Sequence, residues 1–202
     1  MAVTPLQSGA FPALWEEFSD DDGSMWTYMS VGPFSGREEM EEVASPWLGS
    51  PDPLFFTFDM GGKPRGWGAY LRIEPAHGVL EVGHLAFGPS LRRTPAATEA
   101  MYLMMRHVFR LGYRRYEWKC DSLNHASRRA AERLGFTYEG TFRHHMVYKG
   151  RNRDTAWYSI IDRDWPLVGQ SLEAWLEPSN FDRHGVQRRR LSEIREEAMR
   201  NA

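Results

Sequence analysis

The sequence predicts a mixed α/β domain whose central sheet starts antiparallel and turns parallel at one strand pair. Three strand patterns lie at 54–59, 66–73 and 79–87, and the short turns between them predict antiparallel neighbours. A helical pattern at 94–111 then precedes a further strand at 114–120. Because two strands joined through a helix run parallel with a right-handed crossover, the sheet changes character at this point.

The composition fits one globular domain and excludes several functional classes. Of 202 residues, 42% are hydrophobic and 13% aromatic, which is enough for a buried core. A formal net charge of −2 creates no field for nucleic acid, and no apolar run approaches the roughly 20 residues of a membrane span. One cysteine, Cys120, excludes an internal disulfide. With no signal-peptide pattern at the start, we expect a cytoplasmic protein without nucleic-acid or membrane partners.

The first fifty residues are less clearly patterned. Residues 1–23 are interpreted as a loop and 24–31 as a first strand. Ser35 and Glu38 have the spacing of a capping box, which predicts a helix that ends near Trp47. The glycines at 61, 62, 66 and 68 fit neither a Walker phosphate loop nor a dinucleotide fingerprint. A hairpin turn is therefore expected at these residues.

The second half of the chain predicts four more elements. They are a helix at about 126–134 that stops at Gly135, a hairpin of strands 142–148 and 155–161, a short helix near 172–176 and a charged helix at 187–199. Residues 1–202 are therefore expected to form one domain, with its core at about 24–166 and a helical extension at 167–202.

The start of the helix at 94–111 has the pattern of an anion site. Thr94 fits the N-cap position, and Pro95 fits the first helical position, where an N–H is not needed. Arg92 and Arg93 come directly before it. Free N–H groups, the helix dipole and two guanidinium groups together suit phosphate, although a solvated basic turn is the alternative.

Three motifs, in this order of elements, carry a resemblance to a known family. They are Arg-Arg-Thr-Pro-Ala-Ala-Thr-Glu-Ala at 92–100, Asn-His-Ala-Ser at 124–127 with Leu-Gly-Phe at 134–136, and the segment 150–158 leading to Trp-Pro at 165–166. Over about 24–166 the chain resembles the GNAT superfamily of acetyl-CoA-dependent N-acyltransferases, and within it the RimJ/RimL-like branch. The resemblance implies a twisted, mostly antiparallel sheet with one splayed parallel strand pair and helices on both faces.

The resemblance also implies acetyl-CoA as co-substrate, with its diphosphate at the start of the helix. Arg92 and Ala97 take the first and last positions of the family motif [RQ]-x-x-G-x-[GA], but Pro95 replaces the glycine and removes one N–H donor. Four N–H donors are expected to remain for the diphosphate, those of Arg93, Thr94, Ala96 and Ala97. The pantetheine arm is expected between the strands at 79–87 and 114–120. The implied cofactor-binding residues are Leu85, Ala86, Phe87, Arg92, Arg93, Thr94, Ala96, Ala97, Thr98, Asn124 and Ser127.

Ser127 and Asn124 are the candidates for protonating the leaving thiolate and for holding the pantetheine arm. Many relatives carry a tyrosine four positions before the glycine of Leu-Gly-Phe, where this chain has Ala131. The resemblance implies Ser127 as the proton donor instead, with an ordinary helix serine as the alternative. It implies that Asn124 fixes the pantetheine arm, whereas composition alone fits a capping asparagine equally well.

Glu81 and His84 are the candidate catalytic bases. Three residues separate them, so they point to opposite faces of the strand unless a bulge intervenes, and Gly83 is a candidate bulge site. Glu81 is preferred, acting through a water, while His84 has a suitable intrinsic pKa near 6.5. His144 and His145 lie on opposite faces of a strand and no metal motif occurs, so no metal is expected.

The preferred function is direct acetyl transfer from acetyl-CoA to an amine, because Cys120 is interpreted as a packing residue and not a nucleophile. The acceptor is a small-molecule amine or a protein N-terminus. A catalytically degenerate acetyl-CoA-binding module is the alternative, indicated by Pro95 and Ala131. An interaction protein that uses the charged tail is a third reading, and the aromatic-rich hairpin and tail would suit a homodimer.

Overall fold

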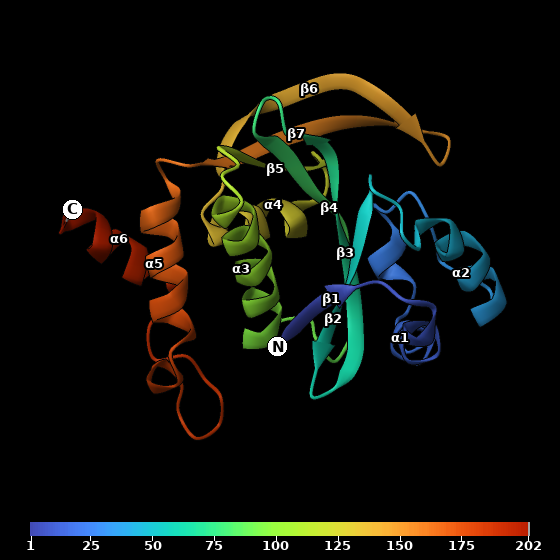
Figure 1. The fold of residues 1–202 in the computed structure, drawn as a ribbon, viewed down its shortest axis with the longest axis horizontal. Coiled ribbons are helices and arrows are strands. Elements are labelled where there is room, and N and C mark those ends of the chain that lie inside the picture. Colours follow the sequence, from blue (N-terminus) through green and yellow to red (C-terminus); the bar gives the residue numbers. More distant parts are fainter. Residues whose placement is uncertain (202) are drawn as a thin grey trace.

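The computed structural model describes residues 1–201, and its centre is a seven-stranded sheet (Figure 1). The strands are β1 (Ala2–Pro5), β2 (Leu54–Met60), β3 (Lys63–Glu74), β4 (Val79–Phe87), β5 (Arg115–Asp121), β6 (Thr137–Tyr148) and β7 (Arg151–Ile161). Their spatial order is β1-β2-β3-β4-β5-β7-β6, and β4–β5 is the parallel pair among antiparallel neighbours. The predicted mixed sheet is confirmed.

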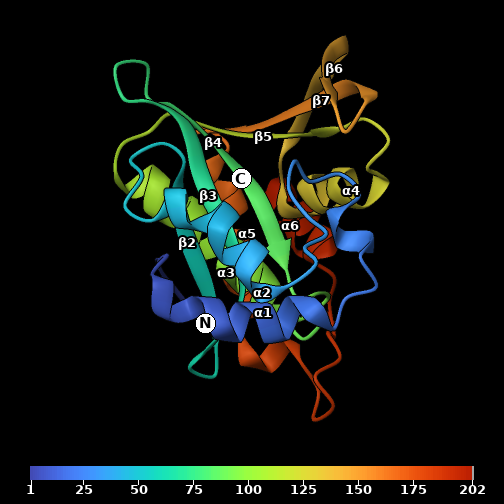
Figure 2. The same ribbon diagram turned by 90° about the vertical axis from the view of Figure 1, so that its right-hand side faces the viewer.

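Helices cover both faces of this sheet, as Figures 1 and 2 show. They are α1 (Phe11–Ser19), α2 (Arg37–Ala44), α3 (Pro95–Arg110), α4 (His125–Leu134), α5 (Trp165–Leu176) and α6 (Leu191–Arg200), with short 3-10 turns at Ser8–Ala10, Ser24–Trp26, Ser45–Trp47 and Pro178–Asn180. The larger core lies between the sheet and α3 to α6, and includes Met104, Tyr116 and Ile160. The smaller core lies under α1 and α2, and includes Phe18 and Trp67.

Helix α3 begins as the sequence predicts. Thr94 has an extended backbone, and its hydroxyl accepts from the Ala97 N–H at 3.3 Å while donating to the Leu91 carbonyl at 2.7 Å. Pro95 is the first helical residue. The buried side chains recur with helical spacing and face the sheet; they include Met101, Met104, Met105 and Val108.

The N-terminal predictions are wrong at two places. Residues 1–23, interpreted as a loop, contain β1 and α1, because β1 pairs with β2 and Phe11, Leu14 and Phe18 bury one face of α1. Residues 24–31, interpreted as a strand, begin with a 3-10 turn that buries Trp26. The core therefore includes residues before 24, and the predicted boundary of the core is corrected accordingly.

The helix predicted after Ser35 exists, but its capping differs from the prediction. Gly36 is the N-cap of α2, and the Ser35 N–H and hydroxyl both donate to the Glu39 carboxylate at 2.6 Å. Glu38 is therefore not the partner of Ser35. Because the contact is one residue longer than a capping box, the serine stays outside the helix.

The C-terminal helix starts later than predicted, at Leu191 instead of 187. Asn180 explains the difference, because its side chain donates to the Trp175 and Arg189 carbonyls and accepts from the Arg189 N–H. Its carbonyl also accepts from the Arg188 N–H. These bonds compete with helix formation at 188–189. The β6–β7 hairpin is also tighter than predicted, with a turn at 149–150.

Gly135 offers a stability test of this packing. It ends α4 with φ of +107°, and an added Cβ would lie 2.9 Å from Val168 Cγ1 on α5. Gly185 has φ of +77° and open space around the same position. We expect Gly185→Ala to cost about 1 kcal/mol for backbone strain. Gly135→Ala should cost a further ~1–3 kcal/mol from overpacking in urea unfolding, and equal losses would contradict tight α4–α5 packing.

Candidate active site

The parallel strands β4 and β5 are paired over only part of their length. Their register runs from Val79–Arg115 to Val82–Trp118, after which β5 continues beside β7 and β4 continues beside β3. Backbone groups of β4 beyond Val82 that face β5 therefore have no strand partner. The stretch that contains Leu85 lies in this opening, where the sequence predicted it.

A bulge in β4 changes which face its later side chains occupy. The β3–β4 register shifts between Gly83 and Ala86, so that Gly68 lies opposite both His84 and Leu85. His84 has a left-handed backbone with φ of 51°. A bulge therefore exists in this strand, but it lies at His84 and Leu85 and not at Gly83, which pairs in register with Ala69. Such bulges re-aim side chains.

The His84 ring lies on the α1–α2 side of the sheet. Its centroid is 5.2 Å from that of Phe55 and 6.2 Å from that of Trp47. Burial lowers the pKa of His84, and the Arg72 charge lowers it further. No side chain among residues 1–201 forms a hydrogen bond with the ring. The neutral imidazole therefore keeps a nitrogen lone pair free at pH 7.

Glu81 lies in a row of alternating charges across the sheet. Its Oε2 is 2.9 Å from Lys119 Nζ and 2.5 Å from Arg72 Nη1. Lys119 Nζ is also 2.8 Å from Glu117 Oε2 and 3.9 Å from the centre of the Trp157 ring. The pKa of Glu81 is raised above its usual value, because the effect of burial outweighs those of Lys119 and Arg72, which act in the opposite direction. Both cations contact the same oxygen, so they hold this carboxylate in place within the sheet.

Asn124 and Ser127 meet at the start of α4. The Asn124 Oδ1 accepts from the Ser127 N–H at 3.0 Å, so the capping interpretation of Asn124 describes its geometry. Ser127 Oγ accepts from Trp118 Nε1 at 3.0 Å. Because this bond uses a lone pair of the hydroxyl, the O–H remains able to donate. Ala131, at the position of the relatives' tyrosine, is buried in the larger core.

The loop between β4 and α3, residues 88–94, offers fewer backbone donors than predicted. The Thr94 N–H donates to the Leu91 carbonyl and the Ala97 N–H donates to the Thr94 hydroxyl. Within residues 1–201, the N–H groups of Arg93 and Ala96 have no such partner. The predicted number of free N–H donors, four, is therefore corrected to two.

The side chains predicted for the cofactor have mixed environments. Arg92 binds Asp21 Oδ2 through Nη2 at 2.5 Å, which leaves Nε and Nη1 for another anion. Thr98 is buried and accepts from Arg133 of α4 at 3.0 Å, so its hydroxyl faces the helix layer. Ala86 is buried, Leu85 packs against the larger core, and Phe87 stacks on Phe58. The buried Ala86 can serve only through its backbone, whereas Leu85 and Phe87 are partly exposed.

The β6–β7 hairpin closes one side of the site against the loop after α1. Lys149 Nζ donates to the Trp26 and Gly32 carbonyls at 2.9 and 2.7 Å, and Arg151 donates to the Thr27 carbonyl at 3.2 Å. Figure 1 shows the hairpin arching from β5 toward this segment. These contacts were missed from the sequence, because nothing local in a Lys-Gly turn indicates its distant partner.

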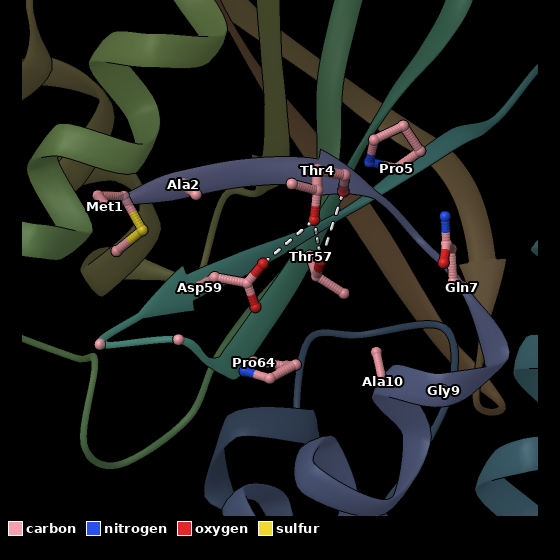
Figure 3. A pocket seen from close by; sticks show the side chains of 12 residues that line it. Met1, Ala2, Thr4, Pro5, Gln7, Gly9, Ala10, Thr57, Asp59 and Pro64 are labelled. Carbon is pink, nitrogen blue, oxygen red and sulfur yellow. Dashed lines mark hydrogen bonds between the residues drawn. The ribbon is translucent and has the colours of Figure 1, made fainter.

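Two concavities are present, and neither is lined by residues of the β4–β5 opening. The larger, about 770 Å³, lies beside the edge strand β1, where Thr4 bonds with Thr57 and Asp59 (Figure 3). None of the predicted site residues lines it. The smaller, about 220 Å³, lies between α1 and the following loop and is lined by Trp15, Phe18, Trp26, Phe34 and four smaller residues.

The structure also addresses metal and membrane features. Among residues 1–201, no group of three His, Cys, Asp or Glu side chains is arranged to hold a metal ion. His145 Nδ1 bonds with Thr155, and the His144 N–H donates to Asp154. None of the described helices combines the length and hydropathy needed to cross a bilayer.

Comparison with known proteins agrees with the fold. The model of the acetyltransferase (GNAT) family matches residues 11–136. A GCN5-related N-acetyltransferase from Brucella melitensis is 47% identical, with a TM-score of 0.93 over 96% of this chain and 90% of that chain. A GNAT-family protein from Chromobacterium violaceum is 40% identical, with a TM-score of 0.76 over 82% and 86%. A search of curated proteins gave no match. Because the family model spans more than half of the chain and the Brucella structure almost all of it, the chain belongs to the GNAT family of acetyltransferases.

Proposed function

We propose that this acetyltransferase moves an acetyl group from acetyl-CoA directly to an amine, as members of the RimJ/RimL-like branch do. The acceptor is a protein N-terminus or a small-molecule amine. The observation that carries the proposal is the separation of β4 from β5 after Val82. It leaves the backbone of β4 without a β5 partner in the stretch between His84 and the donors of the β4–α3 loop.

The residues around this opening fit acetyl-CoA. The N–H groups of Arg93 and Ala96, with the free nitrogens of Arg92, suit the diphosphate. The Nδ2 group of Asn124 has no partner among residues 1–201 and suits a pantetheine carbonyl. When bound, acetyl-CoA supplies the acetyl group as a thioester. An unpaired N–H near Leu85 would stabilise an oxyanion there, an effect worth several kcal/mol in other acyl transferases.

His84 is the proposed proton acceptor for the amine. An alkyl ammonium has a pKa well above 7, so the acceptor arrives protonated and a base must remove its proton. His84 stays neutral because burial and Arg72 lower its pKa. Glu81 is proposed to act electrostatically through its row of paired charges, since Lys119 and Arg72 engage its carboxylate.

Ser127 is the proposed proton donor to the departing thiolate. Its Oγ already accepts from the Trp118 indole, and this bond polarises the hydroxyl and sets its direction. Asn124 holds the same residue by its backbone N–H. Trp118 and Asn124 are therefore proposed to orient Ser127, and the absence of a tyrosine at Ala131 does not remove the proton source.

Release of free thiol from acetyl-CoA across a panel of amines and N-terminal peptides tests this function. We expect wild-type turnover with at least one amine, and Ser127→Ala should lower kcat by about 10²-fold with unchanged coenzyme A affinity in calorimetry. Ser122→Ala, which changes a serine outside α4, is the control. Tight coenzyme A binding without turnover for any amine would favour the degenerate binding module. No coenzyme A binding would contradict the proposal.

A further inference from the structure

A carboxylate of α1 lies inside the β4–α3 loop. Glu17 is 5% exposed, and its Oε1 accepts from the Ser90 N–H at 2.7 Å. Its Oε2 accepts from Arg65 Nη1 at 2.6 Å. Burial raises the pKa of Glu17, but the bonds from Ser90 and Arg65 outweigh this effect and leave it below the usual value. The buried carboxylate is therefore ionised at neutral pH and fully engaged.

The loop closes tightly around this side chain. An added Cβ on Gly88 would lie 2.0 Å from Glu17 Cγ, so only glycine allows the backbone to approach. The Gly88 N–H donates to the Arg65 carbonyl at 2.9 Å, and its own carbonyl accepts from the Leu91 and Arg92 N–H groups at 3.0 Å. The position of Gly88 thus sets the start of the turn that leads to Arg92.

A second carboxylate reaches the same loop just beyond α1. Asp21 Oδ2 binds Arg92 Nη2, while Asp21 Oδ1 accepts from the Gly23 and Met25 N–H groups at 2.9 and 3.2 Å. The Asp21 side chain is 1% exposed, against 39% for Arg92. The fixed partner is therefore the aspartate, and the arginine is oriented by it.

These contacts join α1, on one face of the sheet, to the loop that opens α3 on the other. We propose that Glu17 is a positioning residue for the diphosphate subsite, holding Ser90 and Gly88 so that Arg92, Arg93 and Ala96 present their donors together. The inference rests on the proposed use of acetyl-CoA. It predicts that Glu17 affects binding of the phosphate-bearing part of the co-substrate and has no effect on binding or reaction of the acyl end.

The test compares two acetyl donors, acetyl-CoA and S-acetylpantetheine, which lacks the diphosphate and nucleotide. Glu17→Gln keeps the shape of the side chain but loses its charge. We expect the KM for acetyl-CoA to rise about tenfold, the size of one lost charge-assisted hydrogen bond, with kcat unchanged. Kinetics with S-acetylpantetheine should stay the same. Glu16→Gln, which changes the exposed neighbour on α1, should alter neither donor.

A second variant tests whether a change in KM reflects the loop position or a general loss of folding. Gly88→Ala displaces the loop without changing any charge, and it should show the same selectivity for acetyl-CoA in protein whose thermal unfolding is still cooperative. Equal losses with both donors in Glu17→Gln and Gly88→Ala would reduce Glu17 to a stability role and overturn the proposal. An unchanged KM for acetyl-CoA would overturn it as well. Failure of the wild type to bind coenzyme A in calorimetry would overturn the proposed function itself, which separates the two failures.

Discussion

His84→Gln is expected to lower kcat/KM by about 10²–10⁴-fold, the usual loss when a general base is removed. Glutamine is similar in size and polar, so it preserves the packing against Phe55 and Trp47 while removing the proton acceptor. His77→Gln is the matched control, because His77 is exposed in the turn before β4. Steady-state kinetics with an identified amine measure the change. A wild-type rate in His84→Gln would assign the base elsewhere, and Glu81→Gln would then be the next variant.

The dependence of activity on pH tests the same assignment of His84 as the base. Burial and Arg72 lower the pKa of His84, so the ring loses its proton at a lower pH than an ordinary histidine. Activity should therefore persist below pH 6.5 and fall only as pH drops through the lowered pKa, where the protonated ring can no longer accept a proton. In His84→Gln this acidic limb should disappear. A limb that remains in the variant would belong to another group.

Lys119→Met is expected to destabilise the fold by about 3–5 kcal/mol, the range for removal of one partner from a buried ion pair. The Lys119 side chain is 6% exposed and bonds to both Glu81 and Glu117. Its loss leaves two neighbouring carboxylates that had shared one ammonium group, and each then keeps a single arginine partner, Arg72 for Glu81 and Arg115 for Glu117. Lys63→Met, at the exposed first residue of β3, should change stability by less than ~0.5 kcal/mol. Urea unfolding at pH 7 measures the difference.

Acidification should partly reverse this loss. Without Lys119, mutual repulsion raises the folded-state pKa of the neighbouring carboxyls above their unfolded values, so the folded state binds more protons. The deficit should therefore shrink as pH falls through the raised pKa. Adding Glu117→Gln to Lys119→Met should also recover stability at pH 7, because it removes one of the two charges. A deficit that is independent of pH would indicate lost packing on Trp157 instead of uncompensated charge.

Local signals predicted the parts of the site that depend on local chemistry. Thr94-Pro95 identified the start of α3, and Gly83 indicated a bulge that lies one residue further along, because capping and backbone strain act over a few residues. The parallel β4–β5 pair followed from chain connectivity. The interpretation of these residues as a site for acetyl-CoA needed the family resemblance as well.

Long-range partners could not be predicted in the same way. Glu17 lies 73 residues before Ser90 in the chain, and β1 is only four residues long, too short for a clear alternating pattern. The preference for Glu81 as base rested on its residue type, whereas its availability depends on Lys119 and Arg72, which come from two other strands. The partners of Glu17 and Glu81 depend on contacts between elements, and residue spacing within one element carries no information about such contacts.

The contacts of the β6–β7 hairpin determine which residues of its partner segment can be substituted. Lys149 and Arg151 bind the segment 26–32 only through its main-chain carbonyls, which every residue type possesses. Two positions are constrained: Trp26 is buried in the smaller core, and a side chain at Gly32 would collide with it. Between them, residues 27–31 can change their side chains without losing the main-chain acceptors that hold the hairpin. The segment is thereby open to diversification, by selection or by design, on a scaffold that stays intact.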